Sequence, residues 1–178
     1  MAIIRSDAKM KELILYVAKK SEDDATFGAT KLNKILWAAD FITYARTGKA
    51  ITGLEYFRLP KGPALKQFLP IRNEMIGAGD CAEQIRDHFG HKQKRLIALR
   101  EPDLGGFSGP EIAQVDEVLT RLKNRTAAEV SNWSHRFRGW EAADLEEVIP
   151  YETIFVSRRP LTETEKEFGA TISPTAPA

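Results

Sequence analysis

The sequence has little cysteine, no excess of one charge and no long apolar run, and each shortage excludes a class of protein. Cys81 is the single cysteine among 178 residues, which excludes an internal disulfide and a zinc site built on cysteines. Lys and Arg number 26 against 25 for Asp and Glu, so no overall field attracts the chain to nucleic acid or to an anionic membrane. No stretch approaches the ~20 apolar residues of a membrane span. The chain begins with MAIIRSDAKMKEL, which lacks the apolar core of a signal peptide, and we therefore expect a cytoplasmic protein.

Patterns typical of enzymes and metal sites are also missing from the sequence. It has neither a Walker loop nor the glycine-rich loop that binds dinucleotides. The histidines, His88, His91 and His135, do not show metal-ligand spacing. Ser134 and His135 are neighbours without a nucleophile elbow, and neighbours do not easily form a nucleophile–base pair. We expect no catalytic residue, no metal and no cofactor, and an acid–base pair of Asp40 with His135 is the catalytic alternative.

Apolar residues recur at three- and four-residue spacing along much of the chain, which predicts helices. Ser6 or Asp7 caps the first helix, and residues 30–47 form the second. Pro63 is placed to begin a third helix, which Pro70 should kink or split. Two capping boxes then open later helices: Ser108 with Glu111, and Thr126 with Glu129.

Two other segments read as β structure. Residues 51–59 predict a short strand, and the apolar residues around the Gly90-His91 turn predict a β-hairpin near 82–99. The sequence therefore predicts an α+β, mainly α-helical fold, with five or six helices around a central buried helix at about 30–47 and a small antiparallel β element. Hydrophobic residues make up 43% of the chain, enough for one core. We expect a single domain over residues 1–156 and a disordered tail over 157–178, where apolar periodicity is lost.

The predicted central helix has a second stripe beside its apolar face. The stripe is half aromatic and half polar, and consists of Asn33, Trp37, Asp40, Tyr44 and Thr47. One interpretation is that the aromatic rings fill the core while Asp40 has a specific hydrogen-bonding partner. The other is that the stripe contacts a partner protein. Gly48 should end the helix.

Several short motifs follow one another along the chain: Lys31-Leu32-Asn33-Lys34-Ile35, Gly48-Lys49, Gly62-Pro63, Ser134-His135 and Trp140. In this order and spacing the chain resembles the Panacea domain, the SocA-like antitoxin family, over about residues 28–156. It departs from the usual pattern at Leu59-Pro60-Lys61-Gly62-Pro63, where many members have Tyr-Gly-Pro, and at Pro70. The resemblance implies a non-catalytic antitoxin that neutralises a cognate toxin by direct binding.

The candidate residues fall into two groups. We expect partner contacts from Trp37, Asp40, Tyr44, Lys61, Gly62 and Pro63. We expect a structural role for the family-motif residues Lys31, Leu32, Lys34, Gly48, Ser134, His135 and Trp140. Within that second group, Ser134 and His135 should hydrogen-bond to backbone or to the Asp40 carboxylate, with Trp140 packed over them.

The order of elements also suits a winged helix, which is the alternative function. In that case the hairpin would contact DNA through its basic residues, Arg86, Lys92, Lys94 and Arg95. No aromatic residue lies between His91 and Arg95 to stack on a base, so nucleic acid is the less favoured partner. The tail either orders on a partner or presents the chain to a protease or chaperone. No membrane contact is expected, and the oligomeric state is left open.

Overall fold

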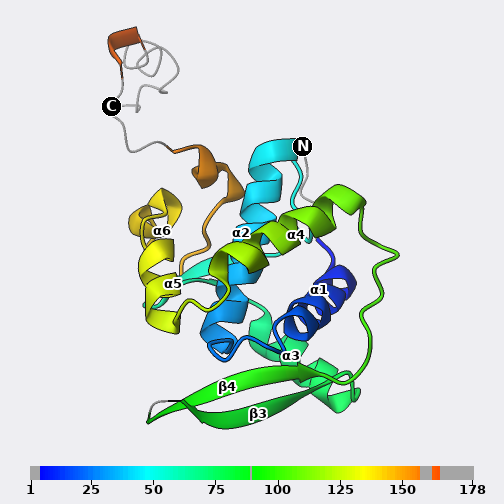
Figure 1. Ribbon diagram of the computed structural model, residues 1–178. Coiled ribbons are helices and arrows are strands. Elements are labelled where there is room, and N and C mark those ends of the chain that lie inside the picture. Colours follow the sequence, from blue (N-terminus) through cyan, green and yellow to red (C-terminus); the bar gives the residue numbers. More distant parts are fainter. Residues whose placement is uncertain (1–4, 89, 157–161, 165–178) are drawn as a thin grey trace.

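The computed structural model describes residues 5–88, 90–156 and 162–164 (Figure 1). The elements follow the chain in this order: α1 (Asp7–Lys20), α2 (Ala29–Thr47), β1 (Tyr56–Leu59), β2 (Gly62–Leu65), α3 (Phe68–Gly77), β3 (Cys81–His88), β4 (His91–Ala98), α4 (Gly109–Leu122), α5 (Ala127–Ser134), α6 (Arg138–Ala142) and a 3-10 helix η1 (Tyr151–Phe155). The fold is α+β and mainly helical, which confirms the fold class predicted from the sequence. The single-domain boundary stays a prediction, and the predicted tail lies outside the described residues except for 162–164.

Helix α2 occupies the centre of the molecule, as its sequence predicts. It contacts α1, α4, α5, β2 and η1, and these elements surround it in Figure 1. Residues 31–41 of α2 are all buried, apolar and polar alike, so neighbouring elements cover this part of the helix on every side. Gly48 ends α2 in the left-handed conformation, with φ +73°, and its N–H donates to the carbonyl of Tyr44 at 2.8 Å. This confirms Gly48 as the stop signal.

The predicted helix starts are also confirmed. Ser6 caps α1, since its Oγ accepts a hydrogen bond from the backbone N–H of Lys9 at 3.2 Å. Complete capping boxes open α4 at Ser108 and α5 at Thr126. These devices satisfy backbone N–H groups that have no partner within the helix.

The segment around Pro63 differs from the sequence prediction. Strands β1 and β2 form a hairpin in which Leu59 pairs with Gly62 and Arg58 with Pro63, so Pro63 lies in a strand and does not begin a helix. A proline fits at an edge, where its missing N–H breaks no ladder bond. Pro70 falls in the first turn of α3, where an N–H has no helical partner anyway, and α3 runs unbroken. The expected kink is therefore wrong.

The second hairpin, β3–β4, confirms the prediction near 82–99. Its antiparallel register runs from Cys81 opposite Ala98 to Asp87 opposite Lys92. Strand β4 contacts α1 and strand β3 contacts α3, and Figure 1 shows the hairpin lying along one end of the molecule.

Candidate partner-binding site

Buried polar side chains on α2 dominate the polar interior of the protein. Lys31, Asn33, Lys34 and Asp40 are all buried, and a buried polar group without a partner is costly. Asn33 accepts a hydrogen bond from the backbone N–H of Leu65 at 3.0 Å, which ties β2 to α2. The other three side chains each tie α2 to a different part of the chain.

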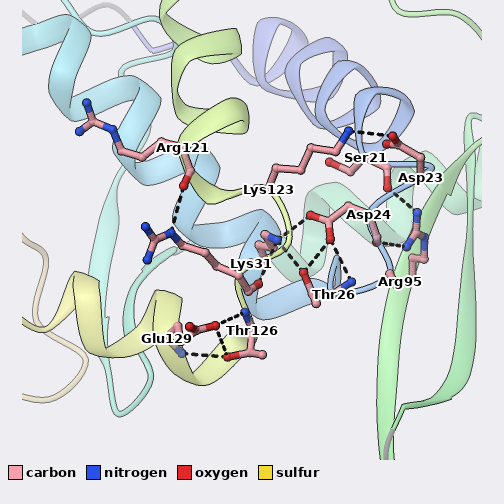
Figure 2. Close-up of polar contacts among 12 residues, drawn as sticks. Ser21, Asp23, Asp24, Thr26, Lys31, Arg95, Arg121, Lys123, Thr126 and Glu129 are labelled. Atoms are coloured by element: carbon pink, nitrogen blue, oxygen red, sulfur yellow. Dashed lines mark hydrogen bonds and ion pairs between the residues drawn. The ribbon is translucent and has the colours of Figure 1, made fainter.

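Lys31 joins α2 to the turn that precedes it and to the connection between α4 and α5 (Figure 2). Its Nζ donates to Asp24 Oδ2 at 2.5 Å, to Thr26 Oγ1 at 2.8 Å and to the carbonyl of Arg125 at 3.0 Å. Burial alone would raise the pKa of Asp24, but hydrogen bonds from Lys31 and Thr26 outweigh it and lower that pKa. Since all three N–H groups of the ammonium meet an oxygen, Lys31 is a structural clamp.

Arg95 holds the same turn from the hairpin side, as Figure 2 shows. Its guanidinium donates to the carbonyls of Asp24 at 2.7 Å, Ser21 at 2.5 Å and Glu22 at 2.8 Å, and the residue is buried. This placement differs from the surface position that the DNA-binding alternative requires. The remaining members of that basic group, Arg86, Lys92 and Lys94, are exposed.

Lys34 lies beside the β1–β2 turn and α5, where most of the family-motif residues meet. Its Nζ donates to the carbonyl of Pro63 at 2.7 Å. Burial, together with the positive charge of Lys61, lowers the pKa of Lys34 to about 7. Gly62 has φ +102°, and a Cβ there would overlap Ser134 Oγ and come within 2.7 Å of Lys34 Cε. Only glycine fits between these two side chains.

The other motif residues near the β1–β2 turn are Ser134, His135 and Trp140. Ser134 Oγ donates to the carbonyl of Ser131 at 2.8 Å, as the backbone alternative predicts. The imidazole of His135 stacks on Trp140 with ring centroids 4.1 Å apart and planes 12° apart. Trp140 Nε1 donates to the carbonyl of Leu59 at 3.0 Å. Trp140 therefore packs over His135, as the sequence predicts, and fixes α6 to the β1–β2 hairpin.

Asp40 has hydroxyl partners and no histidine. Thr52 donates to it from its backbone N–H at 2.8 Å and from its Oγ1 at 2.5 Å, and Tyr56 donates its hydroxyl at 2.8 Å. Burial raises the pKa of Asp40, and these hydrogen bonds offset part of the rise. The alternative of a hydrogen bond from Ser134 or His135 to Asp40 is wrong, because the donors to the Asp40 carboxylate are Thr52, Tyr56 and, at 3.4 Å, Tyr151. The catalytic alternative, an acid–base pair of Asp40 with His135, is therefore wrong as well.

Trp37 lies in the core and not on a surface. It is 5% exposed, and its ring packs within 5.4 Å of the rings of Trp133 and Phe137. A side chain with so little exposure offers a partner almost no area, so the packing interpretation agrees with the structure. Asp40, Gly62 and Pro63 are buried as well. Of the residues expected to contact a partner, Lys61 is exposed and Tyr44 is half-buried.

Tyr44 belongs to an aromatic surface that the sequence reasoning missed. Its ring lies 5.3 Å from Tyr151 and 6.1 Å from Phe155, measured between centroids. Phe155 and the adjacent Val156 are 63% and 56% exposed. We call Tyr44, Phe155 and Val156 the α2-end surface. Its sequence signal is weak, since apolar residues in a short 3-10 helix show no helical stripe.

Neither a metal site nor a membrane span is found in the part of the chain that the structure describes. No group of three or more His, Cys, Asp or Glu side chains there is placed to hold a metal ion. None of the described helices combines the length and apolar character needed to cross a bilayer.

Residues 32–141 match the model of the family described as "Antitoxin SocA-like, Panacea domain". The chain belongs to the Panacea domain family. The match covers more than half of the 178 residues and runs from α2 to α6. It includes Lys34, Gly62, Ser134 and Trp140, four motif residues that meet around the β1–β2 turn. The searches of curated proteins and of solved structures found no match.

Proposed function

We propose that this Panacea domain protein is the antitoxin of a toxin–antitoxin pair, and that it neutralises its toxin by binding it directly, without catalysis. The observation that carries the proposal is the family match over residues 32–141. A family of antitoxin-like domains implies a toxin as partner, and steric blocking by a bound protein needs no reactive group on the antitoxin.

The interior chemistry supports binding over catalysis. The ionisable side chains of α2 use their hydrogen bonds to hold neighbouring elements: Lys31 holds the preceding turn, Lys34 the β1–β2 hairpin, and Asp40 the segment after α2. Each of these groups is shielded from solvent. Lys31 borders a hollow of about 330 Å³, but the three N–H groups of its ammonium already have acceptors. A protein partner needs only the outer surface.

The α2-end surface is the contact that we propose for the toxin. Exposed aromatic side chains with basic residues around them are the composition typical of energetically important interface positions. Here Tyr44 and Phe155 supply the rings, and the exposed Arg46 and Lys49 follow Tyr44 along the chain. Lys61, on the turn of the β1–β2 hairpin, is the second proposed contact.

A purification from the native organism tests the proposal. The tagged full-length chain is isolated at moderate salt, and any protein that elutes in stoichiometric amount is expressed alone and together with the chain. We expect growth arrest when the partner is expressed alone, and growth when both proteins are present. A partner that does not arrest growth, or rescue by a chain that does not bind it, contradicts the proposal. If nucleic acid elutes when the salt concentration is raised, and no protein co-purifies with the chain, the result favours the DNA-binding alternative instead.

Two single substitutions locate the contact. Tyr44→Ala should weaken the complex and the rescue of growth while leaving the chain folded, because the ring is only half-buried. Lys61→Ala, on the hairpin turn, is the matched surface change. If Lys61→Ala weakens the complex and Tyr44→Ala does not, the contact lies at the hairpin turn and not at the α2-end surface.

A further inference from the structure

A hollow of about 570 Å³ lies between the end of α2 and the start of α4. The α2 side is formed by Thr43, Arg46 and Lys49, and the α4 side by Pro110, Glu111 and Gln114. This volume is within the range of sites that hold a small molecule or a few side chains of a partner. The proposed function leaves the hollow unused, although Thr47, which also lines it, lies one turn from Tyr44 on α2.

Two residues that line this hollow each carry a polar atom without a hydrogen bond in the described chain. Thr43 Oγ1 and Gln114 Nε2 are both shielded from solvent, and neither has a partner among the described residues. The two residues are 7% and 4% exposed. A buried donor without an acceptor is destabilising, so such groups are rare unless something binds them. Two of them on one hollow indicate that an acceptor belongs there.

The charges around the hollow favour an anionic acceptor. Arg46 donates from Nη1 to Gln114 and, at 3.0 Å, to Glu117, and within the described chain its Nε and Nη2 make no hydrogen bond. Lys49 Nζ has no ion-pair partner in the same part of the chain. The carboxylate on the wall, Glu111, is already neutralised, since Lys9 Nζ donates to it at 2.7 Å. Within the described chain, Lys49 is therefore the cation without an ion pair at this hollow, Arg46 keeps unused N–H groups beside its ion pair with Glu117, and the two residues with unused donors line the same space.

We propose that this hollow is a subsite for a carboxylate side chain, Asp or Glu, of the protein partner. Gln114 Nε2 and Thr43 Oγ1 donate to the carboxylate oxygens after a small rotation of each side chain, and Arg46 and Lys49 supply the opposite charge at the rim. The inference rests on the proposed function, because the carboxylate comes from the toxin bound at the neighbouring α2-end surface. It adds the chemistry that such a toxin must present, an acidic residue beside an apolar contact.

A titration with a defined probe tests the subsite without the toxin. N-acetyl-glutamate amide is added to the ¹⁵N-labelled full-length chain, and the matched neutral probe is N-acetyl-glutamine amide. We expect saturable chemical-shift changes at the backbone amides of Thr43, Arg46 and Lys49 and at the side-chain amide of Gln114. The neutral probe should bind about tenfold more weakly, since it loses the charge-assisted bonds. Shifts that do not saturate, or equal affinity for the two probes, overturn the proposal.

Isosteric variants separate a binding role from a structural one. Thr43→Val and Gln114→Met remove the unpaired groups at nearly constant volume, so each should lower probe affinity about fivefold or more. The melting temperature of Thr43→Val should stay equal or rise, whereas Gln114→Met also removes the acceptor of Arg46 and is read by probe affinity alone. Thr120→Val, the same chemical change at an exposed position of α4, is the control and should alter neither quantity. A lower melting temperature of Thr43→Val with unchanged probe affinity would show that ordered water satisfies the hydroxyl, which overturns the subsite.

The two proposals fail in different ways. If the toxin complex forms but the Glu probe does not bind, the subsite is wrong and the antitoxin role stands. If the Glu probe binds and its affinity falls in Thr43→Val, but no partner arrests growth, the carboxylate chemistry stands and the assignment of a toxin as its source is wrong.

Discussion

Replacing Lys34 by methionine should remove a large pH dependence from the stability of this protein. Lys34 is 2% exposed, and the hydrogen bond that its Nζ makes goes to the neutral carbonyl of Pro63. Within the described chain it has no carboxylate at ion-pair distance, in contrast to Lys31, which has Asp24. The two buried lysines of the same helix therefore differ. Lys31 is an ammonium paired with a carboxylate, whereas Lys34 has no such partner and a pKa lowered to about 7.

The size of the effect follows from the pKa of Lys34, which burial and the charge of Lys61 lower from 10.5 to about 7. Each pKa unit corresponds to ~1.4 kcal/mol, so the whole difference is about 5 kcal/mol. The folded pKa lies below the unfolded one. Between pH 7 and 10.5 the unfolded chain therefore binds a proton that the folded chain does not, and the free energy of unfolding rises with pH. At pH 7 Lys34 of the folded chain is already half deprotonated, so the rise attributable to Lys34 from pH 7 to about 9 is about 2 kcal/mol.

Urea unfolding of the wild type and of Lys34→Met, followed by circular dichroism at several pH values, measures this term. The stability of the variant relative to the wild type should fall by about 2 kcal/mol from pH 7 to about 9, because the variant lacks the titrating group. Lys49→Met, a substitution of an exposed lysine, is the control and should show a constant difference. A difference for Lys34→Met that stays constant within about 0.5 kcal/mol would mean that Lys34 is protonated throughout, which refutes the reasoning.

Three further substitutions have definite outcomes in the same unfolding assay. Gly62→Ala should cost about 3 kcal/mol or more, because strain at positive φ adds to overlap with Ser134, whereas Gly48→Ala should cost only about 1 kcal/mol, since its Cβ would meet nothing within 4 Å. Lys31→Met should cost about 3–5 kcal/mol by leaving Asp24 charged and unpaired in the interior, and a smaller loss would show that water reaches the carboxylate. Trp37→Ala should cost about 3–5 kcal/mol as a core truncation, and loss of partner binding at unchanged stability would contradict that placement.

Signals that lie within a few residues of one another predicted the local structure well. Ser108 with Glu111 and Thr126 with Glu129 open helices as expected, because both partners of a capping box are three residues apart. Gly48 ends α2 for a similarly local reason. Pro63 shows the limit of such reading. Its place in a strand depends on pairing with Arg58 across the hairpin, and proline suits either an edge strand or the start of a helix.

The sequence identified the motif residues but not their geometry, and of the α2-end surface it identified Tyr44 alone. The motif order identifies Lys34, Gly62, Ser134 and Trp140 as related residues, and the structure brings them together around one turn. The unpaired donors of Thr43 and Gln114 carry no sequence signal, because a threonine and a glutamine in helices are ordinary residues until a hollow forms between those helices.

The sequence by itself determined the class of fold, the central position of α2 and the family, because apolar periodicity, caps and motif order are properties of neighbouring residues. Only the tertiary structure decided which polar groups of α2 are paired and with what. Asp40 receives its hydrogen bonds from Thr52 and from Tyr56, 12 and 16 residues away, and Lys31 reaches the carbonyl of Arg125, 94 residues away. The protonation of a buried group depends on such partners, and a linear sequence does not say which of its distant residues will meet.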